Sequence, residues 1–254
     1  MDSPRAPTDW AGVAAALCFL IALLVELYLL KNKPERSWYE GRAAAESVKT
    51  LSWRYMMGAE PFSIDGPQAD IDCAFLDRLN DVLSVLKDVD LVVGPDVGEQ
   101  VGPAMRAVRV ASLDERKSVY EGNRVREQQD WYSVKAIWNR NRATLWTLAM
   151  IAVEAAGTIA AILKTVGVVR DDLLGLGGAL VAAMTAWLQT KQHRTLATAY
   201  SVTALELSSI RSRIAHQKTE EDWSKFVGDA EEAFSREHTL WKASRGVRPS
   251  ALGH

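Results

Sequence analysis

The sequence predicts an all-α membrane protein. A transmembrane helical hairpin continues into long cytoplasmic antiparallel helical hairpins, and one further transmembrane helix lies near the N-terminus. Three observations predict this class. Two apolar runs, 144–163 and 173–188, flank a short charged segment. A third apolar run covers 10–30. The remaining segments repeat apolar residues at steps of three and four, which is the spacing of an amphipathic helix.

The two central runs have the length and flanking charges of a membrane hairpin. Run 144–163 has roughly 20 residues, enough to cross the hydrocarbon core, whereas 173–188 is shorter and requires tilt or local bilayer thinning. Basic residues flank the outer ends and charges nearly cancel in the connection: Lys135, Arg140, Arg142, Lys191 and Arg194 against Arg170, Asp171 and Asp172. The positive-inside rule places the outer ends in the cytoplasm of a multi-pass inner (plasma) membrane protein.

The N-terminal run is interpreted as a transmembrane helix. The alternative is a signal peptide, but the preceding residues lack a basic segment and no Ala-x-Ala cleavage site follows. Lys31, Lys33, Arg36 and Arg42 follow the run, so its carboxyl end is expected in the cytoplasm.

Two amphipathic helices are predicted after this run. Helix 36–58 has Ala44, Val48, Leu51 and Tyr55 on one face, and helix 71–93 has a similar stripe. That second stripe comprises Ile71, Phe75, Leu79, Val82, Leu86, Val89 and Val93. The two helices can form an antiparallel hairpin and complete a first domain, 1–93. Glycines and prolines in 94–111 predict a linker.

The second predicted domain covers 112–245. Ser112 and Glu115 have the spacing of a capping box that starts a helix over 112–143. No helix breaker follows, so we expect one nearly continuous rod over 113–163. Its expected common face consists of Leu113, Tyr120, Trp131, Trp138 and Leu145.

After the membrane hairpin, another rod is predicted over 190–216. Its stripe is Leu196, Tyr200, Thr203, Leu207, Ile210 and Ile214. Thr219 is expected to cap the last helix, 219–243, with acidic residues in its first turn. That helix has an apolar stripe of Trp223, Val227, Ala230, Phe234 and Trp241. Residues 246–254 are predicted to be a disordered tail.

A faint internal repeat relates the two domains. Ala45, Ser47, Val48 and Leu51 match Ala199, Ser201, Val202 and Leu205 at a constant offset. If the repeat is real, the first domain is a truncated copy that lacks its first membrane helix, and a misplaced start codon is one explanation.

Composition and motifs give no support to other function classes. The 254-residue chain has a net charge of −2, without the basic excess typical of nucleic-acid binding. With only two cysteines, Cys18 and Cys73, we expect no disulfide framework. The four histidines have no metal-ligand spacing, and no nucleophile elbow, phosphate loop or dinucleotide loop occurs. We therefore expect no enzyme activity, no cofactor and no metal.

Three segments carry a family resemblance. They are RVREQQDWYSVKAIWNRN at 124–141, LATAYSVTALEL at 196–207 and WYEGRAAAESVKTLSWRY at 38–55. With the membrane hairpin, they resemble the SLATT family, the SMODS and SLOG-associating two-transmembrane effectors of bacteria. The resemblance implies a truncated first unit and a complete second unit. It also implies a membrane effector of a conflict or anti-phage system, which forms a pore when a nucleotide-generating or nucleotide-sensing partner triggers it.

Glu154 is the sharpest candidate for the mechanism, because a carboxylate within a membrane is costly and usually faces protein or water. It is expected to face the axis of an oligomer; alternatively it is neutral, or hydrogen-bonded to Thr158 or a neighbouring helix. Two ridges of small residues are expected to pack the hairpin together: Ala152, Ala156 and Ala160 with Gly178, Ala182 and Ala186.

Aromatic and basic residues cluster where the rod enters the membrane: Trp131, Tyr132, Lys135 and Trp138. This cluster either couples a cytoplasmic signal to the membrane or packs and anchors the helix at the interface. The expected partners are the lipid bilayer, further copies of the chain and a nucleotide-handling protein. The alternative functions are a non-conducting membrane anchor that recruits a cytoplasmic partner and, with less support, a transporter subunit.

Overall fold

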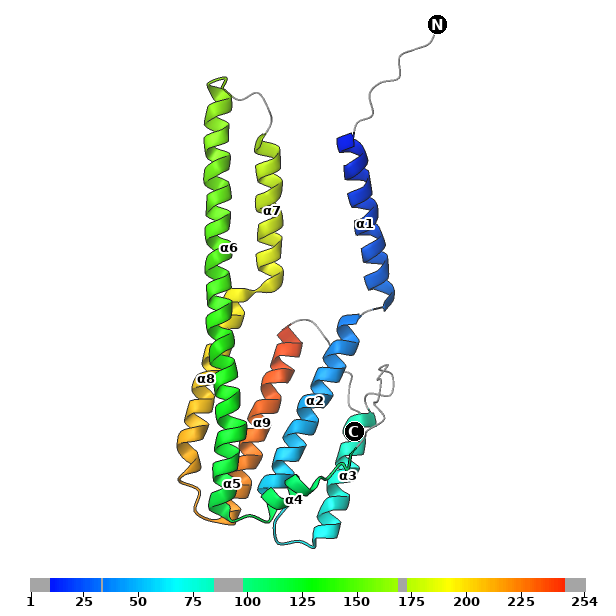
Figure 1. Cartoon of the computed structure of the whole chain (residues 1–254), viewed down its shortest axis with the longest axis vertical. Coiled ribbons are helices and arrows are strands. Elements are labelled where there is room, and N and C mark those ends of the chain that lie inside the picture. Colours follow the sequence, from blue (N-terminus) through cyan, green and yellow to red (C-terminus); the bar gives the residue numbers. More distant parts are fainter. Residues whose placement is uncertain (1–9, 33, 85–97, 169–172, 245–254) are drawn as a thin grey trace. The chain divides into compact units, whose positions relative to one another are not determined.

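The computed structural model describes residues 10–32, 34–84, 98–168 and 173–244, and it contains no strand in these ranges. The chain forms an all-α membrane protein (Figure 1). Its two compact units are residues 1–106 with 227–254, and residues 107–226. The last helix, α9 (Glu220–Ser244), begins in the second unit and continues into the first, whereas the sequence assigned it to the second domain alone.

The first unit begins with α1 (Trp10–Asn32), which covers the apolar run predicted to span the membrane. Its described side chains from Gly12 to Lys31 are exposed, and this segment is long and apolar enough to cross a bilayer. A helix that is apolar on all sides has no solvated face, so lipid is the suitable environment for it.

Helices α2 (Pro34–Met57) and α3 (Gln68–Ser84) pack together as the predicted hairpin. The rings of Tyr55, Phe62 and Phe75 form its core, with centroids 5.0–5.9 Å apart. Ile71 and Leu79 are buried beside them, as the stripe predicted. The end of the predicted stripe, at Leu86, Val89 and Val93, lies outside the described residues.

A polar network holds this hairpin at the edge of its core. Tyr55 Oη donates to Asp72 Oδ1 at 2.6 Å, and Gln68 Nε2 donates to the same oxygen at 2.6 Å. Arg106, at the end of the predicted linker, pairs with Asp72 at 3.2 Å. The predicted linker is therefore partly structured, because α4 (Pro103–Arg109) forms within it and Val101 joins the core.

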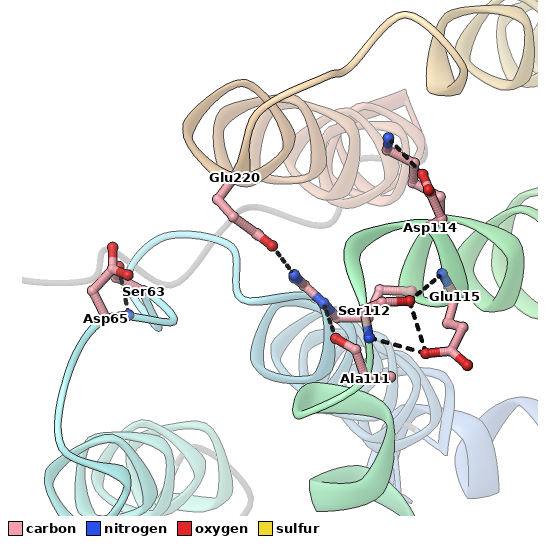
Figure 2. A network of polar contacts seen from close by, with 9 residues as sticks. Ser63, Asp65, Ala111, Ser112, Asp114, Glu115 and Glu220 are labelled. Carbon is pink, nitrogen blue, oxygen red and sulfur yellow. Dashed lines mark hydrogen bonds and ion pairs between the residues drawn. The ribbon is translucent and has the colours of Figure 1, made fainter.

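The second unit is dominated by a single rod from Leu113 to Thr165, as the sequence predicted. The rod comprises α5 (Leu113–Tyr120), a π-helical segment (Glu121–Arg126) and α6 (Glu127–Thr165). Its start has the predicted capping box: Glu115 N donates to Ser112 Oγ at 3.3 Å, and Ser112 N donates to Glu115 Oε2 at 3.0 Å (Figure 2). Arg116 pairs with Glu220 at the start of α9 (Figure 2).

The π-helical segment changes which residues of the rod are buried. A π-turn holds about one more residue than an α-turn, so the face beyond it advances by one position. Beyond the π-helical segment, the buried stripe of α6 is Tyr132, Ala136, Asn139 and Ala143. The predicted face of Trp131, Trp138 and Leu145 was wrong by one residue: these side chains are 40 %, 47 % and 56 % exposed.

The rod packs against α7 (Leu173–Lys191) and α8 (His193–Ile214), which follow it back along its length (Figure 1). Near the end of α8, Arg211 Nε donates to Glu121 in the π-segment at 2.8 Å. Thr203, Leu207 and Ile214 of the predicted α8 stripe are buried. At the start of α9, Asp222 N donates to Thr219 Oγ1 at 3.1 Å, which is the predicted cap, and Trp223 packs edge-on against Tyr120 at 5.6 Å.

The rest of the predicted α9 stripe lies in the first unit. Val227 and Ala230 are buried and Phe234 is half-buried, as predicted. Trp241 is helical, but its side chain lies outside the described residues, as does the predicted tail over 246–254.

Candidate functional site at the α7–α8 junction

The second long helix breaks where the membrane hairpin meets the rods. Gln192 has a left-handed backbone with φ 48°, and it separates α7 from α8. Its N–H donates to Leu188 O at 2.9 Å and its carbonyl accepts from Leu196 N at 3.0 Å, so it closes one helix and opens the next. A non-glycine residue in this conformation costs about 1 kcal/mol. The sequence predicted separate helices over 173–188 and 190–216, but it has no glycine or proline there to mark the left-handed residue between them.

A buried polar pair fixes this break against α6. Asn139 Nδ2 donates to Lys135 O at 2.9 Å, which turns its Oδ1 towards His193; that oxygen lies 2.8 Å from His193 Nδ1. Since Oδ1 can only accept, Nδ1 carries the imidazole proton. Burial lowers the pKa of His193, and the positive charges of Lys191 and Arg142 lower it further. The ring is therefore neutral at pH 7.

Aromatic rings and cations surround this pair. Lys135 Nζ lies over the rings of Trp131 and Trp138, at 5.7 and 5.9 Å from their centroids. Arg142 lies 5.2 Å from the centroid of the Trp138 ring, and the rings of Trp138 and His193 lie 5.6 Å apart, nearly perpendicular to each other. The structure thus brings the predicted members Trp131, Lys135 and Trp138 together. Tyr132, the fourth predicted member, is buried; its ring lies 4.9 Å from that of Trp131 and 5.7 Å from that of Tyr200 on α8.

The aromatic contacts continue into the hairpin. The rings of Trp146 on α6 and Trp187 on α7 lie 6.0 Å apart, and Lys191 lies 4.7 Å from the Trp187 centroid. One turn further, Thr185 Oγ1 lies 3.7 Å from Met150 Sδ. Tryptophan and lysine in this arrangement are typical of the boundary between hydrocarbon and water.

Glu154 lies outside the contact between α6 and α7. It is exposed, and Thr158 Oγ1 donates to its backbone carbonyl at 2.9 Å and not to its carboxylate. Its helix neighbours Met150, Gly157 and Ala161 are half-buried. The carboxylate has no hydrogen-bond or ion-pair partner among the described residues, so the structure leaves it facing the surroundings of the hairpin.

The predicted small-residue ridges do not pack the hairpin together. Ala152 and Ala156 are exposed on α6, as are Gly178, Ala182 and Ala186 on α7; Ala160 is half-buried. The contact instead uses the face that continues the buried stripe of the rod, including Met150 and Gly157, against Val181, Met184 and Thr185. The physical reason is that α6 is one straight helix with one continuous buried face. The packing of α8 against the N-terminal part of α6 determines this face, and α7 packs against its continuation.

Two SLATT family models match the chain. SMODS and SLOG-associating 2TM effector domain 3 matches residues 2–117, and SMODS and SLOG-associating 2TM effector domain 1 matches residues 120–241. Together they cover nearly the whole sequence. The chain belongs to the SLATT family. No curated protein and no solved structure matches it.

The two matches explain the faint internal repeat. In the second SLATT domain, α6 and α7 contain the two apolar runs predicted to form the membrane hairpin, and the repeated residues lie in α8. In the first, α1 carries the apolar span and the equivalent residues lie in α2. Among the described residues, α1 and the rod containing α6 are long and apolar enough to span a membrane. The spanning role of the shorter α7 stays a prediction.

Sequence reasoning missed Asn139, Gln192 and His193. Asn139 and His193 are far apart in the chain, and neither belongs to a motif with recognisable spacing. The available signal was spacing: Asn139 follows Tyr132 by seven residues, which puts both on one face of α6. This face can be recognised as the buried one only when the π-helical segment is known. Over the described residues, no group of three or more histidine, cysteine, aspartate or glutamate side chains could hold a metal ion.

Proposed function

We propose that this SLATT protein is a bacterial membrane effector that self-associates and opens a pore, or otherwise perturbs the inner membrane, when a nucleotide-signalled conflict or anti-phage system is triggered. The family description as a two-transmembrane effector supports the general role. The step from effector to pore rests on the chemistry of the membrane hairpin.

Glu154 is the observation that carries this proposal. It lies near the middle of the apolar segment 144–163, and its side chain is exposed. Placing an acidic residue against lipid at the centre of a helix costs about 3 kcal/mol on insertion scales. Several copies arranged around a common axis relieve this cost, because each carboxylate then faces water and the other copies. A ring of acidic side chains is also a feature of cation-conducting pores.

The small-residue ridges supply a surface for this self-association. Ala152 and Ala156 of α6, and Gly178, Ala182 and Ala186 of α7, are exposed and available to another copy. Small residues at helical spacing allow the backbones of two membrane helices to approach closely. The ridges therefore pack between copies in this proposal, instead of within one hairpin.

The trigger in this proposal is a partner protein that generates or senses a nucleotide. The basic residues near the α7–α8 junction support a cytoplasmic location of the rods in this proposal, where such a partner would bind. Binding along the rods then changes how the copies associate, and the membrane hairpins follow because α6 is continuous with the rod.

Dye release from liposomes tests the pore. Purified full-length protein is expected to release an encapsulated dye, and Glu154→Gln is expected to slow release about tenfold while the oligomer size in detergent is unchanged. Glu26→Gln is the matched control, since Glu26 is a carboxylate near the end of the other apolar span. Equal release by the wild type and the Glu154→Gln variant would remove Glu154 from the mechanism.

A non-conducting membrane anchor is the alternative. The packed aromatic core of α2 and α3 favours it, because a hairpin with its own core, carried by one apolar span, is suited to present a binding surface. This function predicts intact liposomes at every protein concentration, together with co-purification of a partner that is lost when α2 and α3 are deleted.

A further inference from the structure

The α7–α8 junction contains a groove that is lined by both apolar and polar residues. Its volume is about 690 Å³, and it is lined on the apolar side by Ala143, Met150 and Leu188 and on the polar side by Gln192, Arg194 and Thr195. We propose that this groove binds one anionic phospholipid, with the phosphate at Arg194 and an acyl chain along Met150 and Leu188. This inference requires membrane insertion but does not depend on pore formation.

Charge complementarity supports an anionic headgroup. The stretches 131–153 and 173–205, which supply the groove and its surroundings, contain no aspartate or glutamate. The same stretches contain five cations: Lys135, Arg140, Arg142, Lys191 and Arg194. Within the described part of the chain, none of the five forms an ion pair. A positive band without acidic partners attracts phosphate groups at the surface of a bilayer.

The polar wall is built to receive that phosphate. His193 lines the groove and is only 7 % exposed, and its Nδ1 is held by Asn139. Lys191 and Arg142 do not line the groove, but they are near enough to His193 to lower the pKa of its ring, so they add positive charge close to this wall. Arg194 is exposed at the rim, so its guanidinium is free to form a two-pronged contact with a phosphate.

The apolar part of the lining favours a lipid over a free phosphate. Its apolar wall lies between α6 and α7 next to the Trp146–Trp187 contact, where aromatic side chains mark the membrane interface. A water-soluble anion has no apolar surface to bury against Met150 and Leu188, whereas an acyl chain does. A groove whose lining combines apolar side chains with the basic Arg194 therefore matches an amphipathic ligand.

Native mass spectrometry of the full chain in detergent tests this proposal. The probes are dioctanoyl phosphatidylglycerol, dioctanoyl phosphatidylcholine and inorganic phosphate. We expect one phosphatidylglycerol per chain, bound at least fivefold more tightly than phosphatidylcholine. Arg194→Gln should weaken that binding about fivefold, the effect of one basic group near a surface. Arg194→Lys keeps the charge but not the two-pronged contact, so its affinity should lie between that of the wild type and that of Arg194→Gln.

Arg140→Gln is the matched control, because Arg140 belongs to the same basic band and is exposed but does not line the groove. It should change the affinity by less than twofold. Equal losses for Arg140→Gln and Arg194→Gln would indicate diffuse attraction and overturn the proposal. Equal affinity for the two lipids would overturn it, as would displacement of phosphatidylglycerol by millimolar inorganic phosphate.

Discussion

Replacing Asn139 by leucine should destabilise the second unit although leucine has nearly the same shape. Asn139 is buried, and its Oδ1 accepts the Nδ1 proton of His193 at 2.8 Å. The substitution leaves a buried donor without an acceptor, which costs about 1–3 kcal/mol. For a domain of 150–250 residues, a loss of 2 kcal/mol lowers the melting temperature by about 4–8 °C.

The assay is thermal unfolding of the purified full-length protein in detergent, followed by the loss of helical circular dichroism. Asn141→Leu is the control, because Asn141 is an exposed asparagine two residues further along α6; it should change stability by less than about 0.5 kcal/mol. A double-mutant cycle with His193→Leu isolates the pair, with a coupling energy of about 1–2 kcal/mol.

Two results would refute this reasoning. If Asn139→Leu unfolded at the same temperature as Asn141→Leu, the pair would not hold the junction. If the effects of Asn139→Leu and His193→Leu were simply additive, each side chain would contribute through its own packing and not through the hydrogen bond between them.

Three further predictions concern pH and the two cores. The pKa of His193 is lowered by burial and by Lys191 and Arg142, so the folded state binds its proton less readily than the unfolded state does. The free energy of unfolding is therefore retained above about pH 6.5 and falls as acidification protonates the ring. His193→Asn keeps a hydrogen-bond donor but does not titrate, so it should flatten the dependence of melting temperature on pH between pH 5 and 8. Trp223→Ala empties a fully buried site against Tyr120 and should cost about 3–5 kcal/mol in chemical unfolding, whereas Val202→Ala on the exposed face of α8 should cost little. Burial raises the pKa of Asp72, but hydrogen bonds from Tyr55 and Gln68 and the charge and hydrogen bonds of Arg106 outweigh it, so the pKa is lowered. Asp72 therefore stabilises the fold at pH values above its usual pKa of 3.8. Tyr55→Phe should cost about 1–2 kcal/mol at pH 7 and shift the acid unfolding midpoint to higher pH; an unchanged midpoint would contradict the role of the Tyr55 hydroxyl.

The sequence by itself determined the helices and their membrane character. Long apolar runs such as 144–163 have few other stable environments than lipid, and the Ser112–Glu115 box marks a helix start through contacts between close neighbours. The stripe of α3 from Ile71 to Leu79 was predictable for the same reason, since helical periodicity is a local property.

Only the tertiary structure decided which faces meet. The π-helical segment at Glu121–Arg126 advances the face of the rod by one residue, and local sequence does not show it because an extra residue in one turn is stabilised by contacts such as that of Glu121 with Arg211. The left-handed Gln192 and the Asn139–His193 pair likewise depend on residues brought together from distant parts of the chain. Periodicity fixes what each helix has to bury, whereas the phase and the breaks of the helices are set by the partners against which they pack.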